Sequence, residues 1–344
     1  MIEVEELTIP ATADAPDAAD FAAAVDVAMT VEAEGYHTDD LRLSPAESLP
    51  WWHDPNSPRR LFGVRVDGRL VARAMYDRLV TDPENAWAMV QVLSAYRNRG
   101  IGSALADAVE GHIRAEGRSK ILVYAVSADS PGERIASPTG FGSVPAGNRE
   151  VRFLRARGYE LQQVERASRL ALPVDLDVPD AGADYRVHHW VDHTPPEWLE
   201  DMALLHTRMS TDAPTAGLDE PEDVVTVERL LAMEEAHAAS PRSMLTAAAE
   251  HVPSGRLAGF TSLSVPIESD RAVHQDDTLV LREHRGHRLG MLLKIANLVH
   301  LQRERPGHPS VVTFNAEENR YMLDVNEAVG FEPMGYEGAW RLDL

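Results

Sequence analysis

Short segments with alternating apolar and polar residues run through the first half of the chain and predict half-buried β-strands. These strands are expected at Glu3–Ile9, Leu61–Val66, Val71–Leu79, Ala86–Leu93 and Lys120–Val126. Apolar residues at helical spacing, Leu105, Val109 and Ile113, predict a helix over Ser103–Glu116. A further helix is expected over Ala18–Glu34.

The second half of the chain repeats this mixture of strands and helices. Strands are expected at Tyr185–Trp190, Ser243–Ala249, Leu257–Val265, Asp277–Leu281 and Ser310–Phe314. Helices are expected at Pro196–Ser210, Val225–Ala239, Leu292–Gln302 and Asn319–Val329. A last apolar segment, Trp340–Leu344, is expected to close the sheet of this half.

Sequence motifs recur in the same order in both halves, which indicates an internal repeat. The segment DGRLVA at 67–72 returns 187 residues later as SGRLAG, and the basic loop at Arg97 returns 188 residues later at Arg285. Each half then has a strand, a helix and a glycine followed by an aromatic residue, at Gly158-Tyr159 and Gly330-Phe331. We therefore expect two copies of one fold, at 1–172 and 185–344, joined by a Pro- and Asp-rich linker at 173–184.

The composition limits the chemistry that this chain can perform. Its 344 residues are enough for two domains with cores of their own. The absence of Cys excludes disulfides, zinc–thiolate sites and a cysteine acyl-enzyme. A formal net charge of −22 argues against a nucleic-acid partner. Because no apolar run is long enough to cross a membrane and no leader segment is recognisable, we expect a cytoplasmic protein without a membrane partner.

One of the predicted strands ends at a short basic loop with two glycines, and a helix follows at once. Gly100 and Gly102 allow the main chain to approach a ligand closely because they carry no Cβ. The helix that begins near Gly102 points free N–H groups and its positive dipole end at that place, and Arg97 and Arg99 add positive charge. This arrangement suits a diphosphate. The chain has neither the Gly-Lys-Ser/Thr of a Walker loop nor the Gly-x-Gly-x-x-Gly of a dinucleotide site.

The pattern Arg-x-x-Gly-x-Gly from Arg97 to Gly102, with Val92 five residues before the Arg, resembles the acetyl-CoA loop of the GNAT acetyltransferase superfamily. With its repeat, the chain resembles a tandem two-domain member. The resemblance implies an α/β fold of two GNAT-like domains, each a mostly antiparallel mixed sheet flanked by helices. It also implies acetyl transfer from acetyl-CoA, without a metal, to a primary amine of a small molecule. Two alternatives remain, acetylation of protein lysines or N-termini and acyl-CoA binding without catalysis.

The resemblance assigns most of the acetyl-CoA contacts to the backbone. It implies that the strand before each loop, at Val90 and Val92 and again at Val280, pairs with the pantetheine arm and that a strand N–H stabilises the oxyanion. The diphosphate is expected to meet backbone N–H groups of the two loops. These belong to Arg97, Asn98, Arg99, Gly100, Ile101, Gly102 and Ser103 in the first loop, and to Arg285, Gly286, His287, Arg288 and Gly290 in the second.

The second loop departs from the family pattern, because Arg288 stands where the first glycine is expected. Its side chain either crowds the diphosphate or swings out and adds a charge-assisted contact. Asn319, eleven residues before Gly330, matches a CoA-contacting Asn of the superfamily and equally suits a helix N-cap. The first half is therefore expected to be the surer acetyl-CoA binder, and the question of which half catalyses stays open.

Neither half carries the usual general acid of the superfamily, a Tyr four residues before the glycine–aromatic pair. Leu154 and Asn326 stand at these two positions. Tyr321, on the same predicted helix as Asn326, is a candidate acid, although packing or exposure explains it as well. For the base, His274 and Asp276 are expected on one face of the strand before the second loop, and a plain strand-entry turn is the alternative.

Three features are expected near the acceptor. The resemblance puts the first helices of each half there, and residues 1–50 hold twelve acids and one base. An acidic rim attracts a cationic amine, whereas a solvated helical face explains the charge without function. Trp51 and Trp52, in an expected loop, either line a cleft or anchor a core, and the long stretch Ser127–Gly147 is either functional or a tolerated insertion.

A monomer and a homodimer are both compatible with two fused copies.

Overall fold

The computed structural model of the chain describes residues 2–212 and 214–344, and it divides into two compact units. Unit 1 comprises Met1–Arg166, Thr215–Asp219 and Gly335–Leu344. Unit 2 comprises Ala167–Pro214 and Glu220–Met334. The last ten residues therefore group with unit 1, although the sequence repeat assigns them to the second half of the chain.

Unit 1 is built on a mixed β-sheet with the strand order β1-β2-β3-β4-β5-β14-β8. Its strands are β1 (Glu5–Leu7), β2 (Arg59–Val66), β3 (Arg69–Asp77), β4 (Asn85–Val92), β5 (Lys120–Val126), β8 (Glu160–Ala171) and β14 (Glu332–Asp343). Of the last two, residues 160–166 and 335–343 belong to this unit. Neighbours from β1 to β4 and the pair β5–β14 are antiparallel, whereas β4 and β5 run parallel. The five strands predicted in the first half are all present, with ends shifted by a few residues.

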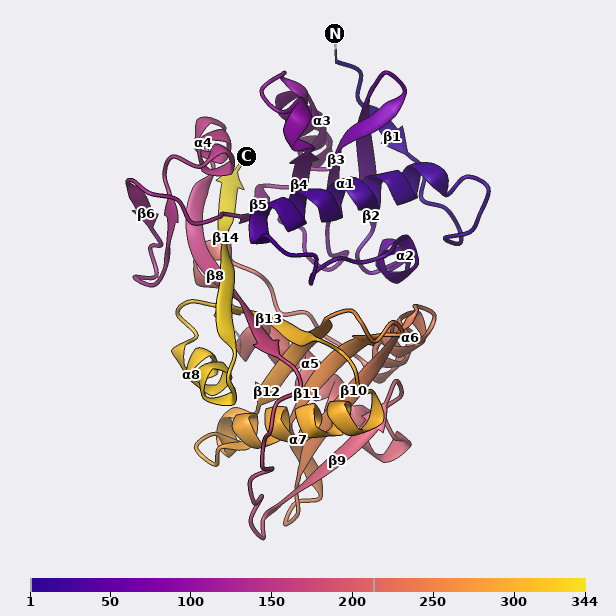
Figure 1. Cartoon of the computed structure of the whole chain (residues 1–344). Helices are drawn as coiled ribbons and strands as arrows, with labels where there is room; N and C mark the ends of the chain where they lie inside the picture. The colour runs from indigo at the N-terminus through magenta and orange to yellow at the C-terminus, as the bar shows by residue number, and fades with distance from the viewer. Residues whose placement is uncertain (1, 213) are drawn as a thin grey trace. The chain divides into compact units, whose positions relative to one another are not determined.

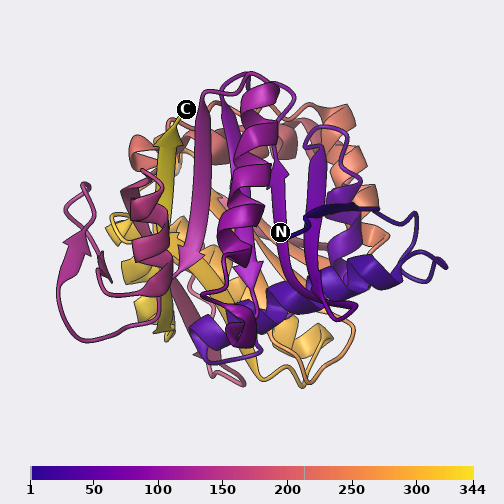
Figure 2. The ribbon, with the colours of Figure 1, turned by 90° about the horizontal axis from the view of Figure 1, so that it is seen from above.

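Helices cover both faces of this sheet (Figures 1 and 2). They are α1 (Ala19–Tyr36), α2 (Pro45–Trp52), α3 (Ile101–Ala115) and α4 (Arg149–Ala156), with a short 3-10 helix η1 (Ser94–Tyr96) before α3. Phe21 of α1 shares a buried cluster with Leu61 of β2, whereas Leu105 of α3 shares another with Val64 of the same strand. Because side chains alternate along a strand, α1 lies on one face and α3 on the other.

The spacing of apolar residues in α3 explains both its position and its end. Leu105, Val109 and Ile113 recur every four residues, and all three are at most 1% exposed. Gly117 follows the helix with a φ of 78°, the left-handed conformation that commonly terminates helices. The predicted helix is thereby confirmed, with its start at Ile101.

The two neighbouring tryptophans lie in helix α2 and not in the expected loop. The helix begins with a capping box, in which the Glu47 N–H donates to Ser44 Oγ at 3.2 Å and the Ser44 N–H donates to Glu47 Oε2 at 2.7 Å. Trp52 packs edge-on against Phe21, with 5.6 Å between the ring centroids. Trp51 is 61% exposed. One tryptophan therefore anchors the core and the other faces solvent.

The strands of unit 2 are likewise mixed in direction and lie in the order β13-β12-β11-β10-β9. Its strands are β9 (Tyr185–Val191), β10 (Arg242–His251), β11 (Arg256–Pro266), β12 (Val273–Val280) and β13 (Ser310–Ala316). Its α-helices are α5 (Leu199–Asp212), α6 (Val227–Ala238), α7 (Leu289–Glu304) and α8 (Arg320–Val329). It also contains two short 3-10 helices, η2 (Pro196–Trp198) and η4 (Arg282–His284). A third 3-10 helix, η3 (Ala216–Leu218), belongs to unit 1. Among the described strands of unit 2, β12 and β13 pair in parallel, whereas β9–β10, β10–β11 and β11–β12 pair antiparallel.

The last strand, β14, differs from the prediction. The segment Trp340–Leu344 is predicted to close the sheet of the second half, but β14 pairs antiparallel with β5, from Glu337 opposite Val126 to Asp343 opposite Lys120. Trp340 is 1% exposed in the main hydrophobic cluster of unit 1. Burial of this large side chain fixes the strand in the first sheet, a preference that local sequence does not encode.

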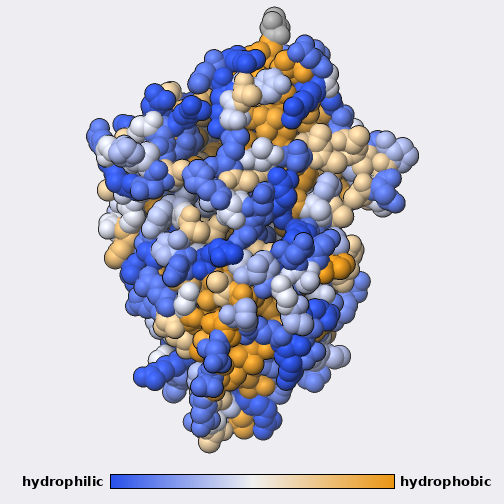
Figure 3. Space-filling model, in the orientation of Figure 1, coloured by the Kyte–Doolittle hydropathy of each residue, from blue (hydrophilic) through white to orange (hydrophobic). Residues whose placement is uncertain are grey.

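Both units confirm the predicted fold class, because each has a mixed sheet with helices packed against it. Among the described residues, no helix is both long and apolar enough to span a membrane. Hydrophilic side chains cover much of the face drawn in Figure 3, with apolar side chains gathered in separate patches.

Candidate functional site

The loop between β4 and α3 has the backbone geometry expected of an anion cradle. Gly100 caps α3 with a φ of 81°, and Asn98 also has a positive φ, of 61°. A Cβ on Gly102 would have no neighbour closer than 3.7 Å, so the first turn of α3 is open on that side. The first N–H groups of α3 lack partners within the helix and point outward at its positive end. This end of α3 therefore suits a phosphate group.

Arg97 stabilises the loop itself. Its Nε donates to the Val92 carbonyl at 2.8 Å, and its Nη2 lies 2.6 Å from the Glu34 carboxylate of α1. The guanidinium is thus largely used within the protein, and its predicted role of adding charge at the diphosphate is reduced. Arg99 donates to the Ala95 carbonyl at 2.9 Å and stacks on Tyr96.

A cavity of about 810 Å³ opens where β4 and β5 separate. The parallel pairing of these strands extends only from Asn85 opposite Lys120 to Trp87 opposite Leu122. Beyond it, residues 88–92 of β4 and 123–126 of β5 line the cavity. The edges of β4 and β5 that face each other here can bond to an extended ligand, because the two strands no longer pair with one another.

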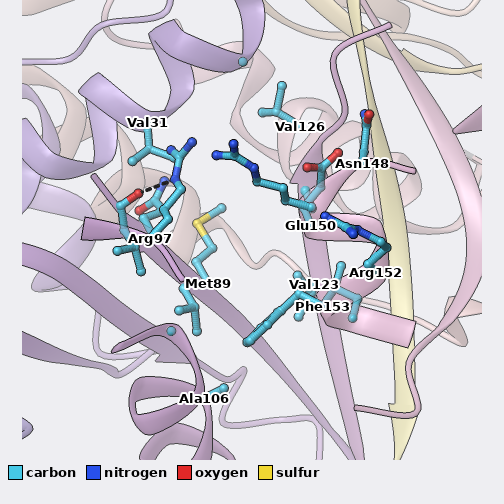
Figure 4. A pocket seen from close by; sticks show the side chains of 18 of the residues that line it. Val31, Met89, Arg97, Ala106, Val123, Val126, Asn148, Glu150, Arg152 and Phe153 are labelled. Atoms are coloured by element: carbon cyan, nitrogen blue, oxygen red, sulfur yellow. Dashed lines mark hydrogen bonds between the residues drawn. The ribbon is translucent and has the colours of Figure 1, made fainter. Parts of the chain in front are cut away.

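The side of the cavity next to α3 and α4 is formed mainly by small, apolar and basic residues. They include Gly100, Gly102, Ser103, Ala106, Val109, Arg149, Arg152, Phe153 and Tyr159, and the carboxylates Glu110 and Glu150 lie among them. Figure 4 shows Phe153 and Arg152 of α4 on one side and Val31 of α1 on the other. The combination of open helix N–H groups with arginines and an apolar wall fits a molecule that carries phosphates at one end and an apolar arm at the other.

Polar and acidic residues line the opposite side of the cavity, next to α1. Glu32 of α1, Gln91 of β4 and Glu337 of β14 all line it. Tyr36 Oη donates to Glu337 Oε2 at 3.3 Å, and the buried Arg73 Nε donates to Gln91 Oε1 at 2.6 Å. Burial raises the pKa of Glu32, against the opposing effect of Arg73. The cavity therefore joins a phosphate-binding end to an acidic end.

The long stretch Ser127–Gly147 forms a two-stranded sheet of β6 (Arg134–Ala136) and β7 (Ser143–Pro145). Its base borders the cavity, where Asn148 Nδ2 donates to the Ala128 carbonyl at 2.8 Å. The Ser127 hydroxyl donates to Glu150 at 2.8 Å. Hydrogen bonds to the start of α4 therefore hold the base of this stretch.

The second loop repeats this geometry with the glycine in a different place. Gly286 has a φ of 87° where the first loop has Asn98, and Arg288 has a φ of 59° where the first loop has Gly100. Arg285 Nε donates to the Val280 carbonyl at 3.1 Å, as Arg97 does to Val92. Its Nη2 lies 2.7 Å from Asp212 of α5. The repeat is thus conserved in conformation, including the arginine that ties the loop to strand and helix.

Unit 2 places a lysine where the cavity of unit 1 has an alanine. At the repeat spacing of the two loops, Lys294 of α7 corresponds to Ala106 of α3. Lys294 is 1% exposed, and its Nζ lies 5.7 Å from the ring centroid of Phe331, the counterpart of Tyr159. Ala106 and Tyr159 both line the cavity of unit 1. The lysine side chain therefore occupies the equivalent space in unit 2.

The predicted base pair on β12 meets a local irregularity. Gln275 lies opposite Leu263 and Thr278 opposite Thr261, so one extra residue at Asp276 and Asp277 forms a β-bulge. The bulge interrupts the alternation on which the shared face of His274 and Asp276 rests. That pair stays a prediction.

A different histidine lies next to this bulge. The Nδ1 of His206 on α5 is 3.7 Å from Asp277 Oδ2, and its ring packs against Phe260 with 4.8 Å between centroids. Burial lowers the pKa of His206 and raises the pKa of Asp277, while each partner opposes the shift of the other. The sequence around β12 gives no sign of this contact, because His206 lies on α5 and reaches the strand only through the packing of that helix.

The remaining candidates of unit 2 lie near α8. The Met322 N–H donates to the Asn319 side chain at 3.3 Å, so Asn319 caps α8. Tyr321 is 54% exposed, and its ring edge comes within 4.0 Å of the place where a Cβ on Gly290 would lie. Asn326 is buried and donates to Asn315 Oδ1 at 2.7 Å. The roles proposed for Asn319 and Tyr321 stay predictions.

The structure gathers seven of the predicted residues of the first loop and strand around one cavity. They are Val90, Val92, Arg97, Asn98, Gly100, Gly102 and Ser103. Ile101 is buried in the core below the loop. Sequence reasoning did not identify Glu32, Gln91 or Glu337, because no motif surrounds them and Glu337 comes from the far end of the chain. An alignment of the two repeats pairs Ala106 with Lys294, and this pair indicates that the space beside the helix differs between the two units.

Comparisons with known proteins agree with this geometry. Residues 25–134, about a third of the chain, match the model of the acetyltransferase (GNAT) family. A tandem GNAT protein from the clavulanic acid biosynthesis pathway is 25% identical, covers 99% of this chain and 98% of its own, and superposes with a TM-score of 0.76. No curated protein matches the sequence.

Two further solved structures share the fold at lower identity. A GCN5-related N-acetyltransferase from Sphaerobacter thermophilus is 16% identical, with 99% of this chain and 95% of that chain covered and a TM-score of 0.64. A putative acetyltransferase from Pyrococcus horikoshii is 10% identical over 100% of this chain and 89% of its own, with a TM-score of 0.54. Residues 25–134 therefore match the GNAT acetyltransferase family, and the chain over almost its whole length is similar to a tandem GNAT protein.

Proposed function

We propose that unit 1 transfers an acetyl group from acetyl-CoA to a primary amine of a small molecule. The observation that carries this proposal is the cavity at the separation of β4 and β5, which joins the open N-terminus of α3 to an acidic end beside α1. The first end suits the diphosphate of acetyl-CoA, and the second suits a cationic acceptor.

Acetyl-CoA supplies the thioester when it is bound, and the residues of unit 1 position it. The N–H groups from Gly100 to Ser103 receive the diphosphate, and the edge of β4 that β5 leaves unpaired, from Val90 to Val92, pairs with the amide-containing arm. A β4 N–H then stabilises the negative charge on the carbonyl oxygen as the amine attacks. Phe153 and its apolar neighbours exclude water from the arm.

The dimensions of the cavity favour a small acceptor over a protein segment. About 810 Å³ lies within the range of cavities that enclose small ligands, and much of it is needed for the arm of acetyl-CoA. Acyl-CoA binding without catalysis is the alternative, and turnover with any amine would exclude it.

We assign the cofactor role to unit 1 because unit 2 differs at two critical positions. Arg288 replaces the glycine that caps the helix, and Lys294 fills the space that Ala106 leaves open in unit 1. Both differences reduce the room for a diphosphate and its arm at α7. Unit 2 then has a supporting role.

The test is an acetylation assay on the full chain with matched variants of the two loops. Gly102→Asp places a negative charge where the diphosphate binds, and an acidic residue in the first turn is compatible with a stable helix. Gly290→Asp makes the same change in the second loop. Since the chain has no Cys, a thiol reagent reports only the CoA released from acetyl-CoA in the presence of primary amines.

We expect Gly102→Asp to lose at least about 100-fold in kcat/KM and Gly290→Asp to retain the wild-type value, because one misplaced charge at a phosphate site costs several kcal/mol. Loss of activity in Gly290→Asp with retention in Gly102→Asp would contradict the assignment to unit 1. Circular dichroism checks that both variants keep the wild-type helix content.

A further inference from the structure

We propose that Glu337, on the last strand of the chain, is the catalytic carboxylate that receives the acceptor ammonium in unit 1 and removes its proton. The inference rests on the proposed function of unit 1 and identifies its base and its class of acceptor, a cationic primary amine. It also makes the C-terminal strand a part of the active site of the N-terminal repeat.

The position of β14 directs Glu337 into the cavity. Glu337 lies opposite Val126, one of the last cavity-lining residues of β5. Trp340 and Leu342 of the same strand pack with the cluster that contains α3. Residues of odd number on β14 therefore point to the other face, where α1 lies. Glu337 thus approaches the separation of β4 and β5 from the side opposite to the phosphate-binding end.

Tyr36 holds the carboxylate in place. Its hydroxyl donates to Glu337 Oε2 at 3.3 Å, and the tyrosine is 5% exposed. Burial, followed by the nearby carboxylate of Glu337, raises the pKa of Tyr36, so its hydroxyl remains a donor. Gly335 allows this close approach of α1 and β14, because a Cβ there would lie 2.5 Å from the Tyr36 ring. One oxygen of Glu337 is fixed in this way, and the other can face a ligand.

The charged groups around Glu337 favour a proton acceptor that works near neutral pH. Glu32 and Tyr36 of α1 and Glu165 of β8 face it, and Arg73 of β3 acts mainly on Glu32. Burial, followed by Glu165 and Glu32, raises the pKa of Glu337 to about 8. A carboxylate in this range matches the proton of an alkylammonium far better than an ordinary glutamate does.

In the transfer step, Glu337 receives the first proton of the acceptor and the departing thiolate receives the second. The ammonium gives one proton to Glu337 and becomes an amine. The nitrogen lone pair forms the C–N bond at the thioester carbonyl, and the C–S bond breaks with its electron pair leaving on sulfur. The second nitrogen proton passes to the thiolate to give CoA as the free thiol, and Glu337 releases its proton to solvent.

The test compares Glu337→Gln with Asp343→Asn in the full chain. Asp343 lies on the same face of β14, pairs with Arg341 at 2.8 Å and does not line the cavity, so its variant is a matched control for the strand. The probes are putrescine, tyramine, benzylamine and glucosamine with acetyl-CoA. The readouts are kcat/KM between about pH 6 and 10 and the affinity for acetyl-CoA by calorimetry.

We expect Glu337→Gln to bind acetyl-CoA as the wild type does and to lose about 100-fold or more in kcat/KM at pH 7. The wild-type profile should rise to a plateau set by the pKa of Glu337 and fall where the amine loses its proton. In Glu337→Gln, kcat/KM should rise with pH only as the fraction of unprotonated amine rises. Glu337→Asp should regain part of the activity, and Asp343→Asn should match the wild type.

Two outcomes separate the inference from the proposed function. If the wild type binds acetyl-CoA but Glu337→Gln keeps its rate and pH profile, or if none of the four amines is acetylated, the inference is overturned. If the wild type does not bind acetyl-CoA at all, the proposed function of unit 1 fails first.

Discussion

Lys294 is an ionisable residue in the buried part of helix α7. It lies among leucines of α7, is 1% exposed, and its Nζ is 5.7 Å from the Phe331 ring centroid. Burial lowers the pKa of Lys294 to about 7. Because the unfolded chain holds this proton up to a pKa of 10.5, folding at neutral pH requires the lysine either to lose its proton or to be buried with its charge.

Lys294→Met is therefore expected to stabilise the protein at pH 7, by up to about 4 kcal/mol. Between the folded and unfolded pKa values the unfolded chain binds more protons, so this contribution to wild-type stability rises from pH 7 to about pH 10. The difference between variant and wild type should shrink over that range. Urea unfolding at several pH values measures it, and a difference that is constant with pH would contradict the buried, shifted lysine.

At the scale of single residues, the sequence predicted those that act through local backbone geometry. The loop from Arg97 to Ser103 could be identified because its glycines and its helix are adjacent in the chain. Glu337 could not be identified, because its role depends on a strand pairing with residues more than 200 positions away. His206 was missed for the same reason, since it meets Asp277 only through the packing of α5.

At the scale of elements, α3 and α7 begin in the same way with different residues. Gly100 caps α3 with a φ of 81°, and Arg288 caps α7 with a φ of 59° and a ψ of 21°. A residue with a Cβ is strained in this left-handed conformation, whereas glycine is not. The second repeat has therefore kept the loop conformation and lost the residue that adopts it without strain.

Arg288→Gly is expected to stabilise unit 2 by about 1 kcal/mol, and the reciprocal Gly100→Arg to destabilise unit 1 by a similar amount. The two substitutions exchange the residues of equivalent positions, so each is the control for the other. Chemical denaturation of both variants measures the effect. A loss of stability in Arg288→Gly would show that the arginine side chain makes contacts that outweigh the backbone strain.

Most elements followed from periodicity, and the exceptions have physical causes. The strand β12 begins at Val273, four residues earlier than predicted, because polar residues such as Gln275 are buried within it by hydrogen bonds to β11. Helix α2 was missed although Ser44 and Glu47 carry a capping-box pattern, since its prolines and tryptophans suggest a loop. The capping box therefore indicated the start of this helix, but the residues that follow it are not typical of helices.

At the scale of the whole molecule, the repeat predicted two copies of one fold, and each unit has the expected mixed sheet. The repeat did not predict that Gly335–Leu344 would group with unit 1. A repeat aligns segments by their order along the chain, whereas a strand pairs where its large apolar side chains are buried, as Trp340 is. The proposed base of the first repeat therefore comes from the end of the second.

The most direct test of this account is the stoichiometry of acetyl-CoA binding to the full chain, measured by isothermal titration calorimetry with wild type, Gly102→Asp and Gly290→Asp. We expect one site per chain, lost in Gly102→Asp and unchanged in Gly290→Asp, because the cavity of unit 1 is open beside Ala106 and its equivalent in unit 2 is filled by Lys294. Two equivalent sites, or one site that survives Gly102→Asp, would contradict the assignment of the cofactor to unit 1.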